Sequence, residues 1–378
     1  MLLVAVAVAV AALVPAVASA APQVRDATAR DEAAHPGPGE RTEWWFVSAL
    51  DPGAGLAVAA ALGTEFPGAP PATVVFLYLP DGAVHTVGAL RAAGPPSTDR
   101  VDVRLDPDRL WSPAPGVYRV RIDMPAGFAL HGPPPGPVAL DLTLRATAPG
   151  FTAGPLALPD GQDLSWVVAA PTARVTGTVR VDGETFRLRD APGYHDHNFG
   201  RFDLADEAHG GWDWSQVHLP AGRSLVTGIV RPSDPSLRDG TAVLSGPGGR
   251  LATARARAVG VARADWDRVG PYHYPRAVTL RARMSGGWTA VVRYRARRAL
   301  PLSFSRDGSS ALVEVEARAA GELRRDGRVV SRWREAPGFY EYESTAVTRQ
   351  RDAVPGSPAW AGRLCAAAAA ALRGGAAG

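Results

Sequence analysis

Apolar and polar residues alternate over much of the chain, and this period of two limits its possible folds more than any other feature. The alternation is clear in residues 118–124, 278–284, 290–297 and 311–318. Successive side chains of a β-strand point to opposite faces of a sheet. Each segment therefore predicts a half-buried antiparallel strand with one face in water.

The turn signals point the same way. Asp-Gly pairs, which are typical of tight hairpins, lie at 81–82, 182–183, 239–240, 307–308 and 326–327. A clear helical period is found only in the Ala-rich residues 360–373. Many short strands without alternating helices predict an antiparallel sandwich or barrel, and closed barrels of about eight strands can hold one small ligand.

Length and composition narrow the functions. At roughly 150 residues per domain, the 378 residues suggest two domains. All 41 basic residues are Arg, which excludes a P-loop lysine and a lysine Schiff base on this chain. Cys365 is the single cysteine, so no disulfide framework or thiolate metal cluster is expected. The net charge of +4 gives little reason to expect a nucleic-acid partner.

The N-terminus and the composition of the chain suggest its organisation. Residues 2–14 form an apolar run, and the small residues Ala18 and Ala20 follow it. This pattern is typical of a cleaved signal peptide at 1–20, with an uncleaved anchor as the alternative. We expect an exported protein, extracellular or in the cell envelope. Its predicted domains span 36–205 and 206–350, and 351–378 form a tail.

The densest polar segment runs Tyr194-His195-Asp196-His197-Asn198 and holds the only Asn of the chain. In an extended backbone, Tyr194, Asp196 and Asn198 share one face, and the two histidines lie on the other. Only one of these sets can face a cavity directly.

This segment has two interpretations that need no metal. In the first, Asp196 is a general acid or base inside an apolar barrel, where burial keeps it protonated while Tyr194 and Asn198 orient it. In the second, the segment is a structural network that satisfies backbone groups at a strand break.

A third interpretation makes the histidines metal ligands. His195 and His197 would bind one ion, and Asp196, His209 or His218 would complete the site. No further His-rich motif fixes the remaining ligands, so we expect no bound metal.

Tryptophans add a second signal. Glu43-Trp44-Trp45 opens the first strand region, Trp166 lies in a later strand, and Trp212 and Trp214 follow the polar segment. Together these rings could line an apolar pocket and stabilise a cation through their faces. We interpret Glu43 as a buried hydrogen-bonding residue. Gly-x-Ser-x-Gly and His-Glu-x-x-His are absent, and no Gly-x-Gly-x-x-Gly leads from a strand into a helix, which argues against common hydrolase and dehydrogenase sites.

The Glu-Trp-Trp motif at 43–45, the segment Gly-Tyr-His-Asp-His-Asn-Phe-Gly at 193–200 and Trp-Asp-Trp at 212–214 resemble the carotenoid 1,2-hydratase (hydroxyneurosporene synthase) family. The resemblance covers about residues 40–345 and implies an all-β fold of two lipocalin-like antiparallel β-barrel domains side by side; the periodicity adds a short C-terminal helix. It also implies cofactor-free addition of water to a terminal double bond, with Asp196 protonating the alkene near Tyr194 and Trp166.

The sequence thus predicts an exported hydratase-like protein that acts on an apolar carotenoid, terpenoid or lipid. Contact with a membrane surface is compatible with such a substrate. Its expected catalytic residues are Asp196, Tyr194 and Asn198. Its expected substrate-binding residues are Trp44, Trp45, Trp166, His195, His197, Trp212 and Trp214. One alternative is a binder of hydrophobic ligands without chemistry. The other is a pericyclase or cyclase, because related two-barrel proteins include pericyclases that close polyenes.

Overall fold

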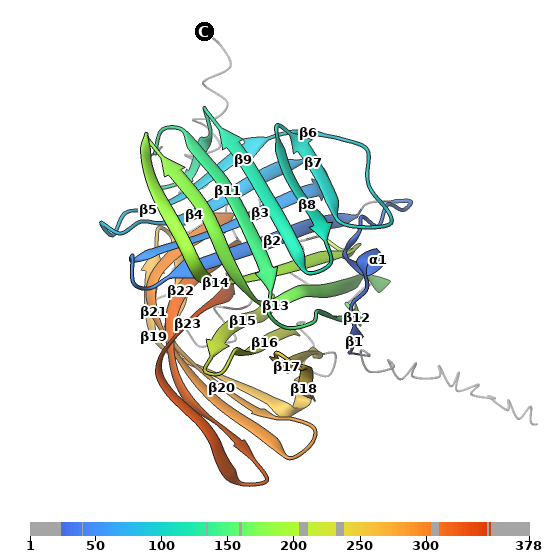
Figure 1. Cartoon of the computed structure of the whole chain (residues 1–378), viewed down its shortest axis with the longest axis vertical. Coiled ribbons are helices and arrows are strands. Elements are labelled where there is room, and N and C mark those ends of the chain that lie inside the picture. Colours follow the sequence, from blue (N-terminus) through green and yellow to red (C-terminus); the bar gives the residue numbers. More distant parts are fainter. Residues whose placement is uncertain are drawn as a thin grey trace, which may run out of the picture.

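The computed structural model describes residues 24–39, 41–133, 135–158, 161–203, 211–231, 238–303, 310–345 and 348 (Figure 1). Most of them form antiparallel strands, arranged in one sheet of 14 strands and one of 9. The first sheet contains β1 (Arg25–Asp26), β2 (Thr42–Asp51), β3 (Leu56–Glu65), β4 (Ala72–Tyr78), β5 (Val84–Leu90), β6 (Ala92–Ala93), β7 (Asp102–Asp106), β8 (Asp108–Ala114), β9 (Val117–Met124), β10 (Phe128–His131), β11 (Val138–Ala146), β12 (Phe151–Ala157), β13 (Asp163–Val181) and β14 (Glu184–Arg201). The second contains β15 (Trp212–Leu219), β16 (Arg223–Val230), β17 (Asp239–Gly246), β18 (Gly249–Arg255), β19 (Val259–Val269), β20 (Tyr272–Arg283), β21 (Trp288–Ser303), β22 (Ala311–Arg325) and β23 (Arg328–Ser344).

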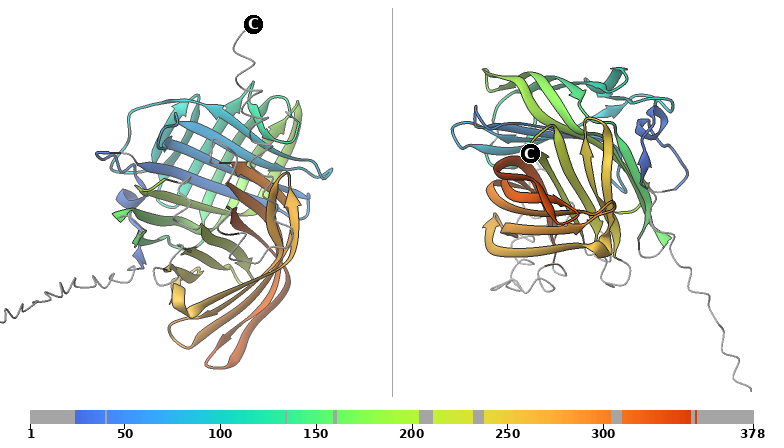
Figure 2. Two further views of the ribbon diagram at one scale, coloured as in Figure 1. Left: turned by 180° about the vertical axis from the view of Figure 1, so that it is seen from behind. Right: turned by 60° about the horizontal axis from the view of Figure 1, so that its bottom comes forward.

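Each sheet is built by the same rule. Most strands pair with their neighbours in the chain, and the last strand returns to an early one, β14 to β2 and β23 to β15. Both sheets curl, and they lie against each other (Figures 1 and 2). The predicted all-β, lipocalin-like fold is confirmed. The strands of the first sheet end at Arg201, and those of the second begin at Trp212.

Two of the predicted Asp-Gly turns connect the longest hairpins. Asp182 and Gly183 have φ of 49° and 82° between β13 and β14, and Asp326 and Gly327 have φ of 50° and 78° between β22 and β23. Positive φ at both central residues is the geometry that matches the twist of paired strands. The pair at 81–82 also lies in a hairpin turn, between β4 and β5.

The turn predicted at 239–240 is wrong, because both residues belong to β17. A Cβ on Gly240 would lie 2.2 Å from the carbonyl oxygen of Gly228. Glycine at this position therefore allows the two strands to approach closely and does not form a turn. The pair at 307–308 lies outside the described residues, as do the expected signal peptide at 1–20 and the helix at 360–373.

Buried apolar side chains form separate clusters. One fills the interior of the first sheet and includes Val120, Leu140 and Val175. A second fills the interior of the other sheet, around Val292 and Val315. A third cluster joins the two sheets and contains Phe46, Tyr78, Phe151, Trp166, Tyr194, Trp214 and Phe339.

The prediction that residues 311–318 have one face in water is wrong for most of that segment. Residues 311–317 of β22 are all buried, and Glu314 is 0% exposed. The reason is that the first sheet covers the face expected to be polar. The Tyr78 hydroxyl of β4, for example, donates to the backbone oxygen of Glu314 at 2.9 Å.

Helix is scarce in the described part of the chain. The helices there are α1 (Ala29–Glu32) and a short 3₁₀ turn at Ala256–Ala258, and neither is long enough to cross a membrane. The α1 helix starts with a capping box, in which the Thr28 side chain accepts from the Asp31 backbone and the Asp31 side chain accepts from that of Thr28. The backbone oxygens of Glu32 and Asp31 in this helix lie within hydrogen-bond distance of the Trp45 and His197 side chains.

Candidate functional site

Strand β14 divides the polar segment between its two faces, as its period of two predicts. Asp196 and Asn198 line a cavity between the sheets, and the Tyr194 ring packs in the apolar cluster that joins them. The two histidines point the other way. His195 contacts Tyr118, a residue of the cluster inside the first sheet, with 4.7 Å between ring centroids.

Three side chains donate hydrogen bonds to the Asp196 carboxyl group. The indole Nε1 of Trp166 donates to Oδ2 at 2.9 Å, and the Tyr194 hydroxyl donates to the same oxygen at 2.7 Å. Nδ2 of Asn198 donates to Oδ1 at 3.1 Å. The donors come from β13 and β14, so the hairpin itself holds the carboxyl group in place.

Burial dominates the titration of Asp196, which is 3% exposed. It raises the pKa of Asp196 to about 7, although the bonds from Trp166, Tyr194 and Asn198 act in the opposite direction. The carboxyl group is thus partly protonated at neutral pH, and the same three donors stabilise the anion once the proton has left. These are the properties that a general acid needs.

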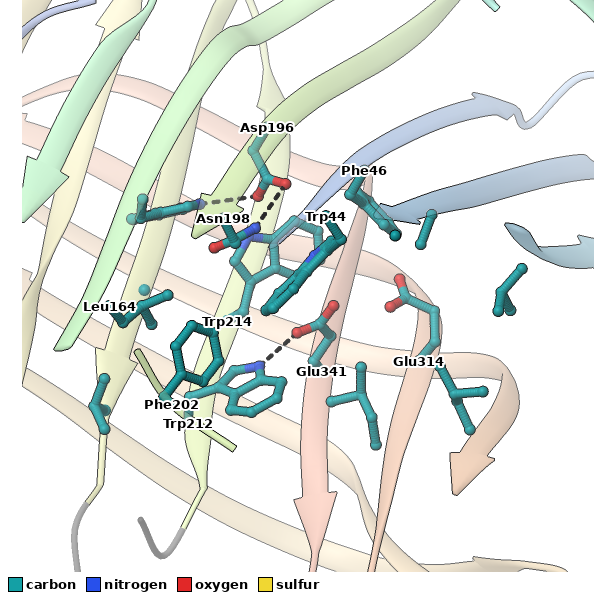
Figure 3. Close-up of a pocket in the computed structure, with 18 of the residues that line it drawn as sticks. Trp44, Phe46, Leu164, Asp196, Asn198, Phe202, Trp212, Trp214, Glu314 and Glu341 are labelled. Carbon is teal, nitrogen blue, oxygen red and sulfur yellow. Dashed lines mark hydrogen bonds between the residues drawn. The ribbon is translucent and has the colours of Figure 1, made fainter. Parts of the chain in front are cut away.

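The cavity offers about 110 Å³ to the centres of water-sized groups. One water needs at least about 10–15 Å³ on such a measure, so the space suits a multi-atom apolar group. Both sheets line it, and Figure 3 shows Asp196 opposite side chains of the second sheet. The expectation of an acid inside a barrel is therefore corrected, since packed side chains fill the interior of the first sheet and the cavity lies between the sheets.

The structure brings most of the predicted tryptophans together. Trp44, Trp166, Trp212 and Trp214 line the cavity with Phe46 and Phe202. The exception is Trp45, which lies on the opposite face of β2. Its indole donates to the backbone oxygen of Glu32 at 3.0 Å. Its ring also stacks on His197, with 4.2 Å between centroids.

The histidines expected to bind substrate do not line this cavity. His195 has Nδ1 2.8 Å from the backbone oxygen of Phe46, and burial lowers the pKa of His195 to about 4. His197 has Nε2 3.0 Å from Oε1 of Glu43. As expected, Glu43 is a buried hydrogen-bonding residue, and it also accepts from the His35 backbone at 2.8 Å.

A metal site built on both histidines does not form among the described residues. His35, Glu43 and His197 have ligand-type atoms within 4.8 Å of one another, but His195 is not in this group. Asp196 points to the opposite face of β14, and His218 contacts Gln216. His209 lies outside the described residues. Hydrogen bonds to His197 and His35 outweigh burial and lower the pKa of Glu43 to about 2, which fits an internal polar network.

Sequence reasoning missed two carboxyl groups in the cavity wall. Glu314 and Glu341 belong to β22 and β23, and Figure 3 shows Glu341 beside Trp212 and Glu314 on the strand next to Glu341. Nε1 of Trp212 donates to Oε2 of Glu341 at 2.6 Å. Glu314 alternates with valines and was expected on a solvated face. Only the packing of the second sheet on the first reveals its burial.

Comparisons with solved structures support the fold. A candidate AttH from Nitrosomonas europaea is 21% identical, with a TM-score of 0.55 over 88% of this chain and 99% of that one. Kievitone hydratase from Nectria haematococca is 13% identical, with a TM-score of 0.55 over 85% and 93%. CghA with Sch210972 is 16% identical, with a TM-score of 0.55 over 81% and 88%.

No curated protein matches the sequence. A family model described as a domain of unknown function matches residues 28–337, which is most of the chain. The chain therefore belongs to the family known as DUF7064.

Proposed function

We propose that the protein adds water to a carbon–carbon double bond of an apolar polyene or terpenoid, with Asp196 as the proton donor. The observation that carries this proposal is the Asp196 carboxyl group, buried in an apolar cavity and held by three donors. A solvent-exposed carboxyl group would be ionised at neutral pH, whereas a pKa raised to about 7 leaves part of the Asp196 population protonated and able to donate.

The reaction suits the walls of the cavity. Transfer of the Asp196 proton to one alkene carbon leaves a carbocation at the other. Trp44 and Trp214 line the same space, and aromatic rings attract cations through their faces. A water oxygen then bonds to the cationic carbon, and loss of a proton gives the alcohol. Tyr194 and Asn198 orient the acid throughout.

Two further points support this choice. The fold is shared with kievitone hydratase, and the motifs at 43–45, 193–200 and 212–214 resemble those of carotenoid 1,2-hydratases. An acyclic carotenoid is the substrate that this resemblance favours, and other apolar polyenes fit the same lining. We also propose export of the protein, on the basis of residues 1–20.

The test follows product mass. Full-length protein is incubated with lycopene, squalene and a total lipid extract in H₂¹⁸O. We expect an alcohol that carries one labelled oxygen from the wild type and none from Asp196→Asn. The variant retains the shape of the site, so its thermal unfolding should stay close to that of the wild type.

Other results would favour the alternatives. A product of unchanged mass would indicate a cyclase. Tight retention of pigment or lipid by both forms, without any product, would indicate a binding protein. Equal alcohol formation by wild type and Asp196→Asn would remove Asp196 from the mechanism.

A further inference from the structure

The two sheets carry the same short pattern on their last strands. Residues 191–196 of β14 read Ala-Pro-Gly-Tyr-His-Asp, and residues 336–341 of β23 read Ala-Pro-Gly-Phe-Tyr-Glu. Asp196 and Glu341 thus end matching segments. The pairing partners match as well, because β14 pairs with β2 as β23 pairs with β15.

The glycines of this repeat have the same local role. A Cβ on Gly193 would lie 2.9 Å from the backbone oxygen of Ser48, and one on Gly338 would lie 2.4 Å from that of Gln216. Both contacts are with the strand on the same side of the repeat. The two segments are therefore equivalent in three dimensions, and each delivers a carboxyl group to the shared cavity.

Each carboxyl group also accepts from an indole, although the two tryptophans lie on different sides of the repeat, Trp166 on β13 and Trp212 on β15. Trp166 donates to Asp196 at 2.9 Å, and Trp212 donates to Glu341 at 2.6 Å. Burial raises the pKa of Glu341 to about 7, as it does for Asp196. Glu341 is thus a second carboxyl group in the cavity wall, half-buried, whose pKa is raised to near neutrality.

Glu314 distinguishes the second site from the first. It lies directly opposite Glu341 in the β22–β23 ladder and lines the cavity with it. Its side chain is fully buried, and among the described residues the Glu341 carboxyl group is the neighbour with which its own carboxyl group can share a hydrogen bond. Two adjacent carboxylates repel each other in a buried site, so the pair is stable only when it holds a proton. Burial and the neighbouring Glu341 together raise the pKa of Glu314 well above its ordinary value.

We propose that Glu314 and Glu341 form the water-activating site of the reaction, across the cavity from Asp196. Glu314 remains protonated and supports the ionised Glu341, which holds the attacking water. This inference rests on the proposed hydration. It adds a general base to the acid and assigns the two roles to different sheets.

Atoms and charges balance over the cycle. The Asp196 proton forms a C–H bond with the alkene electron pair, which leaves the Asp196 carboxylate and a carbocation. The water oxygen forms the C–O bond while its proton passes to the Glu341 carboxylate. Return of one proton from Glu341 to Asp196 through solvent restores the starting state, so the sum is alkene plus water to alcohol.

Deuterium oxide separates the two carboxyl roles. A cation that no water captures can return a proton to Asp196 and regenerate the alkene, which then carries deuterium. With lycopene and squalene as probes, Glu341→Gln should form alcohol at least about 100-fold more slowly than the wild type, the low end of the usual contribution of a general base. The same variant should still place deuterium in the recovered alkene. Asp196→Asn should lose both activities.

Glu314 is tested by two variants of different chemistry. Glu314→Gln keeps a neutral donor beside Glu341 and should keep most of the alcohol formation. Glu314→Leu removes that donor and should lose it. The matched control is Glu316→Gln on the same strand, because the Glu316 carboxylate pairs with Arg298 at 2.6 Å and does not line the cavity.

The outcomes are distinct. Alcohol formation by Glu341→Gln at the wild-type rate would overturn this inference and leave Asp196 as the acid. Equal loss of alcohol and of deuterium exchange in folded Glu341→Gln would also overturn it, because the pair would then have no separate role in capturing water. If the wild type forms no alcohol from either probe, the proposed function fails and this inference fails with it. Thermal unfolding of each variant identifies a loss that arises from misfolding.

Discussion

Trp214 donates its indole N–H to the Tyr194 hydroxyl at 3.3 Å, which links a strand of the second sheet to the acid of the first. Tyr194 in turn donates to Asp196 at 2.7 Å. Burial and the neighbouring Asp196 raise the pKa of Tyr194 well above its ordinary value, so the hydroxyl remains a donor. The strength of the acid therefore depends on how the two sheets pack together.

Removing the hydrogen bond from Trp214 to Tyr194 should make Asp196 a weaker acid and leave its position unchanged. Trp214→Phe keeps an aromatic ring in the cluster but loses one hydrogen bond, which is worth about 0.5–1.5 kcal/mol. We expect hydration to fall by roughly 2- to 10-fold. The descending limb of the pH–rate profile should move to higher pH, because Tyr194 then stabilises the Asp196 anion less. An unchanged limb would contradict the link.

Trp166→Phe should shift that limb further than Trp214→Phe does. Trp166 bonds directly to Asp196 and lowers its pKa, so loss of the indole donor raises that pKa. The measurement is the pH dependence of kcat for both variants and the wild type. A limb at the wild-type position in Trp166→Phe would show that Asp196 does not control the profile.

The wild-type rate should fall as pH rises above about 7, where Glu341 is already ionised. The acid must carry its proton, and the pKa of Asp196 is raised to about 7 from an ordinary value of 3.8. Above that pH the acid-dependent rate should decline about tenfold per pH unit. A rate that rises with pH over this range would identify a different proton donor.

The unfolding free energy of the protein should also depend on the protonation of Asp196. Between pH 3.8 and about 7 the folded protein holds a proton on Asp196 that the unfolded chain has released. The stabilisation that this proton gives the folded state is fully present below pH 3.8 and is lost as pH rises through about 7. Asp196→Asn should therefore show a smaller decline of the unfolding free energy over this window. Urea unfolding at several pH values measures it, and parallel curves for the two proteins would contradict it.

The polar network on the opposite face should matter for stability and not for hydration. Glu43→Gln weakens the contacts of the buried Glu43 with His197 and His35, and leaving such groups poorly paired costs about 1–3 kcal/mol. We expect a lower urea midpoint with an unchanged KM. A raised KM in a fully folded variant would return His197 to the substrate-binding residues.

The sequence predicted those features that depend on local pattern. Alternation was sufficient to place Asp196 and Asn198 on one face of β14 and the histidines on the other. The Asp-Gly turn at 182–183 follows from the backbone preferences of its two residues. Features that arise between the sheets left no local signal. Glu314 alternates with valines like any solvated glutamate, and its burial depends on strands more than 200 residues away.

The same limit explains why the ligand cavity was predicted in the wrong place. Nothing in an alternating strand indicates whether its second face meets water or another sheet, so the cavity was expected inside a barrel. Trp45 and Trp44 are neighbours in sequence, yet only Trp44 reaches the cavity. Period-two reasoning separates such pairs, but it does not show which member faces the ligand.

The Tyr78 hydroxyl, which donates to the backbone of β22, is one of the contacts that set the spacing between the sheets. A small rotation of one sheet on the other would change the width of the cavity while Asp196 and Glu341 kept their own indole donors. Ligand size could then diverge among members of the family through substitutions at such distant contacts, with every residue around the acid unchanged.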